Sequence, residues 1–169
     1  MKQGFIKVTA VTPKVRVADP EYNAREICKG IEEAVERGAK LIVFPELCLT
    51  GYTCGDLFLQ ELLLTRALDA LSTVALVTEG SDALVFVGLP IVKAHKLYNV
   101  AAVLQNGEVL AFVPKRYIPS YAEFYEARHF APGNLLPEPF LYEDKEVPFG
   151  TDILFICEEE PELVAAAEI

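Results

Sequence analysis

Along this chain, segments whose apolar residues are spaced as in β-strands alternate with segments whose apolar residues are spaced as in amphipathic helices. Residues 5–11 are rich in β-branched and aromatic side chains and predict a first strand. The continuous apolar run at 40–44, "KLIVF", predicts a strand buried on both faces, which Pro45 ends. A third strand is predicted at 83–88, "ALVFVG", and the pattern changes after Pro90.

Two amphipathic helices are predicted between these strands. Asp19-Pro20 begins the first one, with aspartate as N-cap and proline at the first helical position, and Gly38 ends it. Its apolar stripe consists of Ile27, Ile31 and Val35. The second helix covers 60–77, and Leu63, Ala67, Ala70, Leu71 and Val74 share one side of it. The order of strand, helix and strand predicts an α/β fold.

The second half of the chain has a different pattern. Asn106-Gly107 is a strong hairpin turn because both residues tolerate positive φ, so we expect antiparallel strands at 98–104 and 108–113. Residues 131–149 are rich in proline, glycine and acidic residues and are interpreted as a long loop. Further strands are predicted at 152–157 and 163–169.

Composition narrows the function classes. The chain has 169 residues, 52% of them hydrophobic, and a net charge of −10, which argues against binding nucleic acid or an anionic membrane. No apolar stretch reaches the roughly 18 residues of a membrane span, and we see no signal peptide. The four cysteines (Cys28, Cys48, Cys54 and Cys157) form no CxxC pair. We therefore expect a cytoplasmic protein with reduced thiols and no bound metal.

Two charged residues stand where catalytic groups collect. Glu46 directly follows a buried strand, and the carboxyl ends of strands in α/β sheets carry active sites, so it is a candidate general base. Lys115 ends a hairpin strand and is a candidate cation for a developing oxyanion. Taken singly, a surface glutamate in a loop and a lysine at a strand end are equally ordinary interpretations.

The remaining candidates are aromatic, acidic and thiol groups. The segment 117–126 interleaves tyrosine, phenylalanine and glutamate, which suits a small polar pocket or plain loop packing. Cys48 and Cys54 are nucleophiles by residue type only, since His95 and His129 are the sole histidines and neither is near them in sequence. A Cys-Lys-Glu arrangement needs no histidine.

Three segments together resemble a known family: "VFPELCLTGYTCGDLF" (43–58), "YNVAAVLQNGEVLAFVPKRYIPSYAEFYEARHF" (98–130) and "APGN" (131–134). They are similar to the nitrilase superfamily, and more narrowly to the N-terminal glutaminase domain of bacterial glutamine-dependent NAD synthetases. "FPEL" before a Gly-Tyr pair is a superfamily feature, whereas "TGYTCGDLF" with "PSYAEFYE" is more specific. The resemblance covers essentially the whole chain and implies an α-β-β-α sandwich, of which residues 1–169 form the N-terminal, incomplete part.

The resemblance also assigns roles. It implies a Glu-Lys-Cys triad whose base falls on Glu46 and whose lysine falls on Lys115, with Glu126 as a supporting glutamate. It places Tyr52, Tyr121 and Phe124 around the glutamine.

The nucleophilic cysteine is not matched in this way. The family motif resembles "EICED", and the chain reaches only Glu168-Ile169, so the resemblance implies a cysteine directly after Ile169. Cys157, in "FICEEE", is the rival. We therefore expect these 169 residues by themselves to be inactive.

Partners and alternatives follow from the same resemblance. It implies L-glutamine as substrate, a synthetase domain on the same polypeptide and a homo-oligomer. ATP and Mg²⁺ would bind to that synthetase domain, and we expect no cofactor in the domain to which residues 1–169 belong. The alternatives are another nitrilase-type amidase, carbamoylase or nitrile hydrolase, and a non-catalytic interaction domain.

Overall fold

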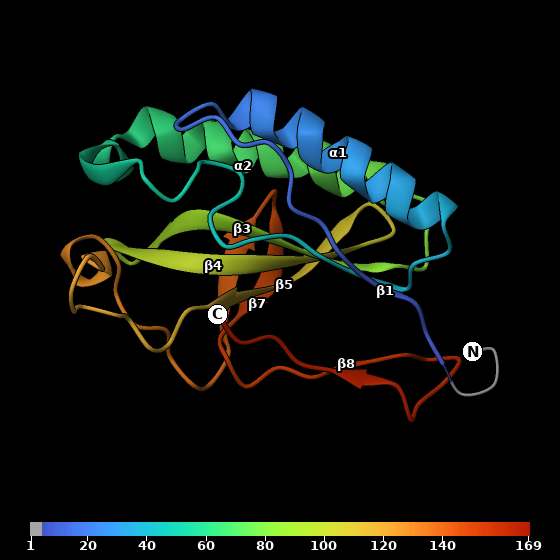
Figure 1. Ribbon diagram of the computed structural model, residues 1–169. Coiled ribbons are helices and arrows are strands. Elements are labelled where there is room, and N and C mark those ends of the chain that lie inside the picture. Colours follow the sequence, from blue (N-terminus) through green and yellow to red (C-terminus); the bar gives the residue numbers. More distant parts are fainter. Residues whose placement is uncertain (1–4) are drawn as a thin grey trace.

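Both expected helices form and lie side by side over one face of a sheet in the computed structural model, which describes residues 5–169 (Figure 1). Helix α1 runs over Pro20–Glu36, and its N-cap Asp19 accepts a hydrogen bond from the backbone N–H of Tyr22. Gly38, with φ of +79°, lets the chain turn away after the last helical turn. Helix α2 runs over Glu61–Val77. Both helix predictions are confirmed to within a residue or two.

The main sheet has seven strands in the order β1-β2-β3-β4-β5-β7-β6. Strands β1, β2 and β3 are parallel, β3, β4 and β5 are antiparallel, and β7 lies parallel to β5. A separate antiparallel pair consists of β8 and β9. The bounds are β1 Val8–Ala10, β2 Leu41–Val43, β3 Leu84–Lys93, β4 Lys96–Gln105, β5 Glu108–Pro114, β6 Glu138–Tyr142, β7 Lys145–Phe149, β8 Phe155–Ile156 and β9 Val164–Ala165.

The hairpin at Asn106-Gly107 is confirmed. Both residues have positive φ, +48° and +82°, as the turn between β4 and β5 requires. Strand β3 is longer than predicted, because it continues through Pro90 to Lys93 and pairs with β4. The strands predicted at 5–11, 152–157 and 163–169 form only in part.

The interpretation of residues 131–149 as a long loop is wrong. Its second half forms the β6–β7 hairpin, whose turn at Glu143-Asp144 has φ of +46° and +63°. Proline and acidic residues on the exposed face concealed the strand pattern. On the inner side, Tyr142 and Phe149 are buried and pack on Phe112 of β5. Tertiary packing therefore stabilises strands that local propensity disfavours.

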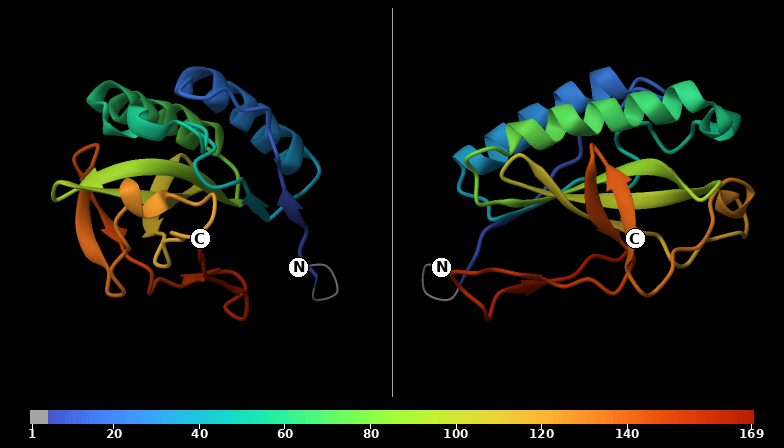
Figure 2. Two further views of the ribbon diagram at one scale, coloured as in Figure 1. Left: turned by 60° about the vertical axis from the view of Figure 1, so that its left-hand side comes forward. Right: turned by 180° about the vertical axis from the view of Figure 1, so that it is seen from behind.

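The principal core lies between the two helices and the sheet. Ile27 and Ile31 of α1 and Leu71 and Val74 of α2 are fully buried there. On the opposite face a smaller cluster, including Phe86 of β3, packs under the C-terminal segment that carries β8 and β9 (Figure 2). The expected α/β class is confirmed, with one helical layer on one face of the large sheet.

Candidate active site

Glu46 lies just beyond the carboxyl end of β2, where the backbone crosses very close to β3. The backbone N–H of Leu49 donates to the carbonyl of Gly88 at 3.1 Å. A Cβ on Gly88 would lie only 2.3 Å from the backbone nitrogen of Leu47, so this approach requires glycine. Leu47 has φ of +51°, which is uncommon for a non-glycine residue. These constraints fix the point from which the Glu46 side chain leaves the backbone.

Lys115 directly follows β5 and is held by its own backbone. Its N–H donates to the carbonyl of Asn99 at 2.7 Å, and its carbonyl accepts from Gly133 at 2.9 Å. The ammonium group lies between two carboxylates, 2.9 Å from Oε2 of Glu46 and 2.9 Å from Oε1 of Glu126. Burial by itself would lower the pKa of Lys115, but the two carboxylates outweigh burial and raise it. The lysine is therefore a buried, fixed cation.

Glu126 begins the short 3₁₀ helix η2 (Glu126–Arg128) and is only 5% exposed. Its Oε1 also accepts a hydrogen bond from the Tyr52 hydroxyl at 2.9 Å. Burial raises the pKa of Tyr52, and the Glu126 carboxylate raises it further, so the phenol stays a donor. Arg128 ties η2 to the short helix η1 (Gly55–Leu59) through two nitrogens on the carboxylate of Asp56. The loops that carry Tyr52 and Glu126 are thus joined.

Asn99 of β4 is a member of this site that the sequence interpretation missed. It is fully buried, and its Nδ2 donates to Oε2 of Glu46 at 3.1 Å. A useful sign was present in the sequence: an asparagine within the apolar strand "YNVAAVL" needs a polar partner.

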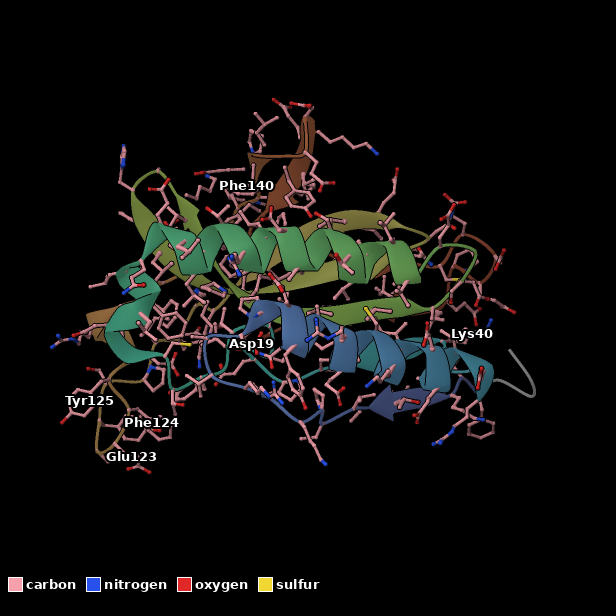
Figure 3. The ribbon with its side chains drawn as sticks, turned by 90° about the horizontal axis from the view of Figure 1, so that it is seen from above. Asp19, Lys40, Glu123, Phe124, Tyr125 and Phe140 are labelled. Carbon is pink, nitrogen blue, oxygen red and sulfur yellow. The ribbon has the colours of Figure 1, made fainter. Side chains whose placement is uncertain are left out.

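Two of the three predicted pocket aromatics lie in the segment before η2. Tyr121 and Phe124 pack edge to face, with ring centroids 5.6 Å apart, and Tyr121 is 68% exposed. Figure 3 shows Phe124 beside Glu123 and Tyr125 at one end of the molecule, clear of both helices. Of the three aromatic residues proposed for the glutamine pocket, Tyr52 is the one whose side chain donates a hydrogen bond to the Glu46–Lys115–Glu126 network.

A cavity of about 260 Å³ opens beside Glu46. Strands β2, β3 and β4 line it together with the last residues of the chain, including Glu168 and Ile169. Within residues 5–169 its lining contains no cysteine. Cys157 instead directly follows β8, and its backbone N–H donates to the carbonyl of Leu163, which precedes β9.

Two further cysteines lie close to Glu46 in sequence, but both are buried. Burial raises the pKa of Cys48 to about 12. It also raises the pKa of Cys54. Such thiols are poor nucleophiles at neutral pH.

Comparison with known proteins identifies the family. The carbon-nitrogen hydrolase family matches residues 7–161, most of the chain. This chain belongs to the carbon-nitrogen hydrolase family.

Two relatives of this chain, from different bacteria, have the same name. The glutamine-dependent NAD(+) synthetase of Mycobacterium tuberculosis is 41% identical over 170 residues, which cover 99% of this chain and 25% of that protein. The synthetase of Aquifex aeolicus is 37% identical over 156 residues, covering 92% of this chain and 26% of that protein. The chain thus spans about a quarter of the length of these relatives.

Solved structures agree in fold. A glutamine-dependent NAD(+) synthetase from Cytophaga hutchinsonii superimposes with a TM-score of 0.85 at 32% identity, covering 91% of this chain and 26% of that one. An amidase from Nesterenkonia superimposes with a TM-score of 0.65 at 22% identity, covering 85% of this chain and 56% of that one, which shows a shared fold.

The candidate site has one cation between two carboxylates, with a neutral amide donor beside them. Such a group can take up a proton and stabilise a nearby anion without a metal ion. Among the described residues, no group of three or more histidine, cysteine, aspartate or glutamate side chains is arranged to hold a metal. A search of the same residues finds no helix long and apolar enough to cross a membrane.

Proposed function

We propose that this chain is the N-terminal part of the glutaminase domain of a glutamine-dependent NAD synthetase. The observation that carries the proposal is the Glu46–Lys115–Glu126 network, with both Nζ–Oε distances at 2.9 Å, beside an open cavity. The names of the relatives that match nearly the whole chain support glutamine as the substrate.

In the proposed reaction a cysteine thiol loses its proton to Glu46 and attacks the side-chain amide carbon of glutamine. Lys115 stabilises the negative charge on the carbonyl oxygen of the tetrahedral intermediate. The intermediate collapses to a glutamyl thioester, and the proton held by Glu46 leaves with the nitrogen as ammonia. Glu46 then takes a proton from water, whose hydroxide cleaves the thioester to glutamate and restores the thiol.

We place the nucleophile directly after Ile169 in the parent enzyme. Support comes from the cavity, because Glu168 and Ile169 line the same space as Glu46. Cys157 is the rival, although it is not among the residues that line the cavity. On this proposal, residues 1–169 hold the base and the cation but hydrolyse no glutamine alone.

The parent enzyme would pass ammonia to a synthetase domain on the same polypeptide, where ATP and Mg²⁺ would serve the conversion of deamido-NAD to NAD. Glutamine would contact Tyr52, with Tyr121 and Phe124 nearby once the pocket is complete. We also propose that the parent enzyme forms a homo-oligomer and is located in the cytoplasm.

Glutamate release from L-glutamine tests these statements. The parent enzyme should be active, and Glu46→Gln or Lys115→Met should each abolish its activity. The 169-residue chain should release no glutamate. Release that disappears in Cys157→Ala would make Cys157 the nucleophile, and a parent enzyme that prefers aliphatic amides, carbamoyl compounds or nitriles would refute glutamine as its substrate.

A further inference from the structure

Asn99 contacts the base of the site from a position that the proposed reaction does not use. It lies on β4 opposite Pro90 of β3, fully buried, and its Nδ2 donates to Oε2 of Glu46 at 3.1 Å. The same oxygen accepts from Lys115 at 2.9 Å. Among the described residues, Oε1 of Glu46 accepts no hydrogen bond from a protein group.

We propose that Asn99 is a positioning residue that fixes the rotamer of Glu46, so that Oε1 is the oxygen that exchanges protons. The inference rests on the proposed function, since it names the atom of Glu46 that would act as base. With Oε2 held by two donors, Oε1 is the oxygen left free to accept a proton from a group in the cavity.

The side-chain carbonyl oxygen of Asn99 indicates that this residue does not serve to stabilise the fold. Its Oδ1 is buried and has no hydrogen-bond partner. An unpaired buried carbonyl is unfavourable, and leucine would fill nearly the same volume without that cost. The backbone carbonyl of Asn99 is already paired with the N–H of Lys115. The bond to Glu46 is the one favourable polar contact that the side chain makes within residues 5–169.

A neutral donor also suits the charges around Glu46. Lys115 faces it from the end of β5, Glu126 lies on the far side of that lysine, and the Tyr52 hydroxyl bonds to Glu126. Glu168 lines the same cavity. One cation therefore faces several acidic groups, and the amide N–H of Asn99 holds Oε2 of Glu46 without adding a further charge.

Asn23 provides a matched control. It is also a buried asparagine, but both halves of its amide are bonded to backbone: Nδ2 donates to the carbonyls of Arg16 and Leu49, and Oδ1 accepts from the N–H of Arg16. Asn23 thus ties segments of the fold together and contacts no residue of the site.

The test compares Asn99→Leu, Asn99→Asp and Asn23→Leu in the parent enzyme. Asn99→Leu should lower kcat for glutamine about 10- to 100-fold, the usual effect of losing a hydrogen bond to a charged group, with KM nearly unchanged. The acid limb of its kcat/KM profile should move to higher pH, and its Tm should not fall. Asn99→Asp, nearly isosteric, should lose at least as much activity. Asn23→Leu should lower Tm and leave the profile in place.

Two results would overturn the inference: Asn99→Leu with wild-type kcat and pH profile, or Asn99→Leu with a lowered Tm and an unmoved acid limb. A wild-type enzyme that does not hydrolyse glutamine would instead refute the proposed function. In that case the crystal structure of Asn99→Leu still decides the question. The Glu46 side chain should leave its wild-type rotamer, and an unchanged rotamer would overturn the inference by itself.

Discussion

Replacing Gly88 with alanine tests whether the close crossing of β3 and the Glu46 segment sets the geometry of the site. The new Cβ would lie 2.3 Å from the nitrogen of Leu47, 2.6 Å from the oxygen of Pro45 and 2.7 Å from the carbonyl carbon of Glu46. Real Cβ contacts below 3.0 Å essentially do not occur, and ordinary contact begins at 3.4 Å. All three neighbours are backbone atoms, so rotating a side chain relieves nothing.

The size of the effect follows from these distances. Raising 2.3 Å to 3.4 Å requires the Glu46 segment to move about 1 Å from β3. Overpacking of this kind costs about 1–3 kcal/mol of unfolding free energy. The same displacement disturbs the 2.9 Å contact between Glu46 and Lys115. A misplacement of about 1 Å in a catalytic group lowers kcat about 100-fold.

The assay is chemical denaturation together with glutamine hydrolysis by the parent enzyme. Gly80→Ala is the control, because a Cβ on Gly80 would meet no atom within 4 Å, while the φ of +73° strains any side chain there. It should lose about 1–2 kcal/mol through backbone strain and keep its kcat. Wild-type stability and kcat in Gly88→Ala would refute the steric argument. Equal losses of kcat in both variants would show that instability alone explains the effect.

Three further predictions concern stability and reactivity. Asp19→Ala should lower the unfolding free energy by about 1 kcal/mol, since Asp19 caps α1 through Tyr22, and a wild-type denaturation curve would contradict this. The pKa of Lys115 is raised above its ordinary value of 10.5, so its ion pairs stabilise the fold fully below about pH 10 and progressively less as pH rises through the raised value. The unfolding free energy of wild type should show this alkaline decline, and the decline should be smaller in Lys115→Met, because other groups with raised pKa values such as Tyr142 remain. Cys48, with a pKa of about 12, is ionised to roughly one part in ten thousand at pH 8, so mass spectrometry after brief iodoacetamide treatment should find it unmodified in the folded protein; rapid labelling would contradict the burial.

Local sequence determined those elements that begin or end with residues of a strong backbone preference. The N-cap and proline at Asp19-Pro20 and the turn at Asn106-Gly107 each favour one backbone conformation, and both elements form as predicted. The β6–β7 hairpin was missed because its evidence is not local. Its strands are stabilised by packing of Tyr142 and Phe149 on Phe112, which lies far away in sequence.

The candidate site also combines features that the sequence predicts with features that depend on the tertiary structure. The strand-end positions of Glu46 and Lys115 and the family resemblance were sufficient to nominate both residues from the sequence. Only the tertiary structure decided that one ammonium lies 2.9 Å from each of two carboxylates, that Asn99 donates to Glu46, and that Gly88 permits the crossing. A sequence pattern specifies which face of a strand is buried, whereas distances between side chains on different strands depend on register and packing across the whole sheet.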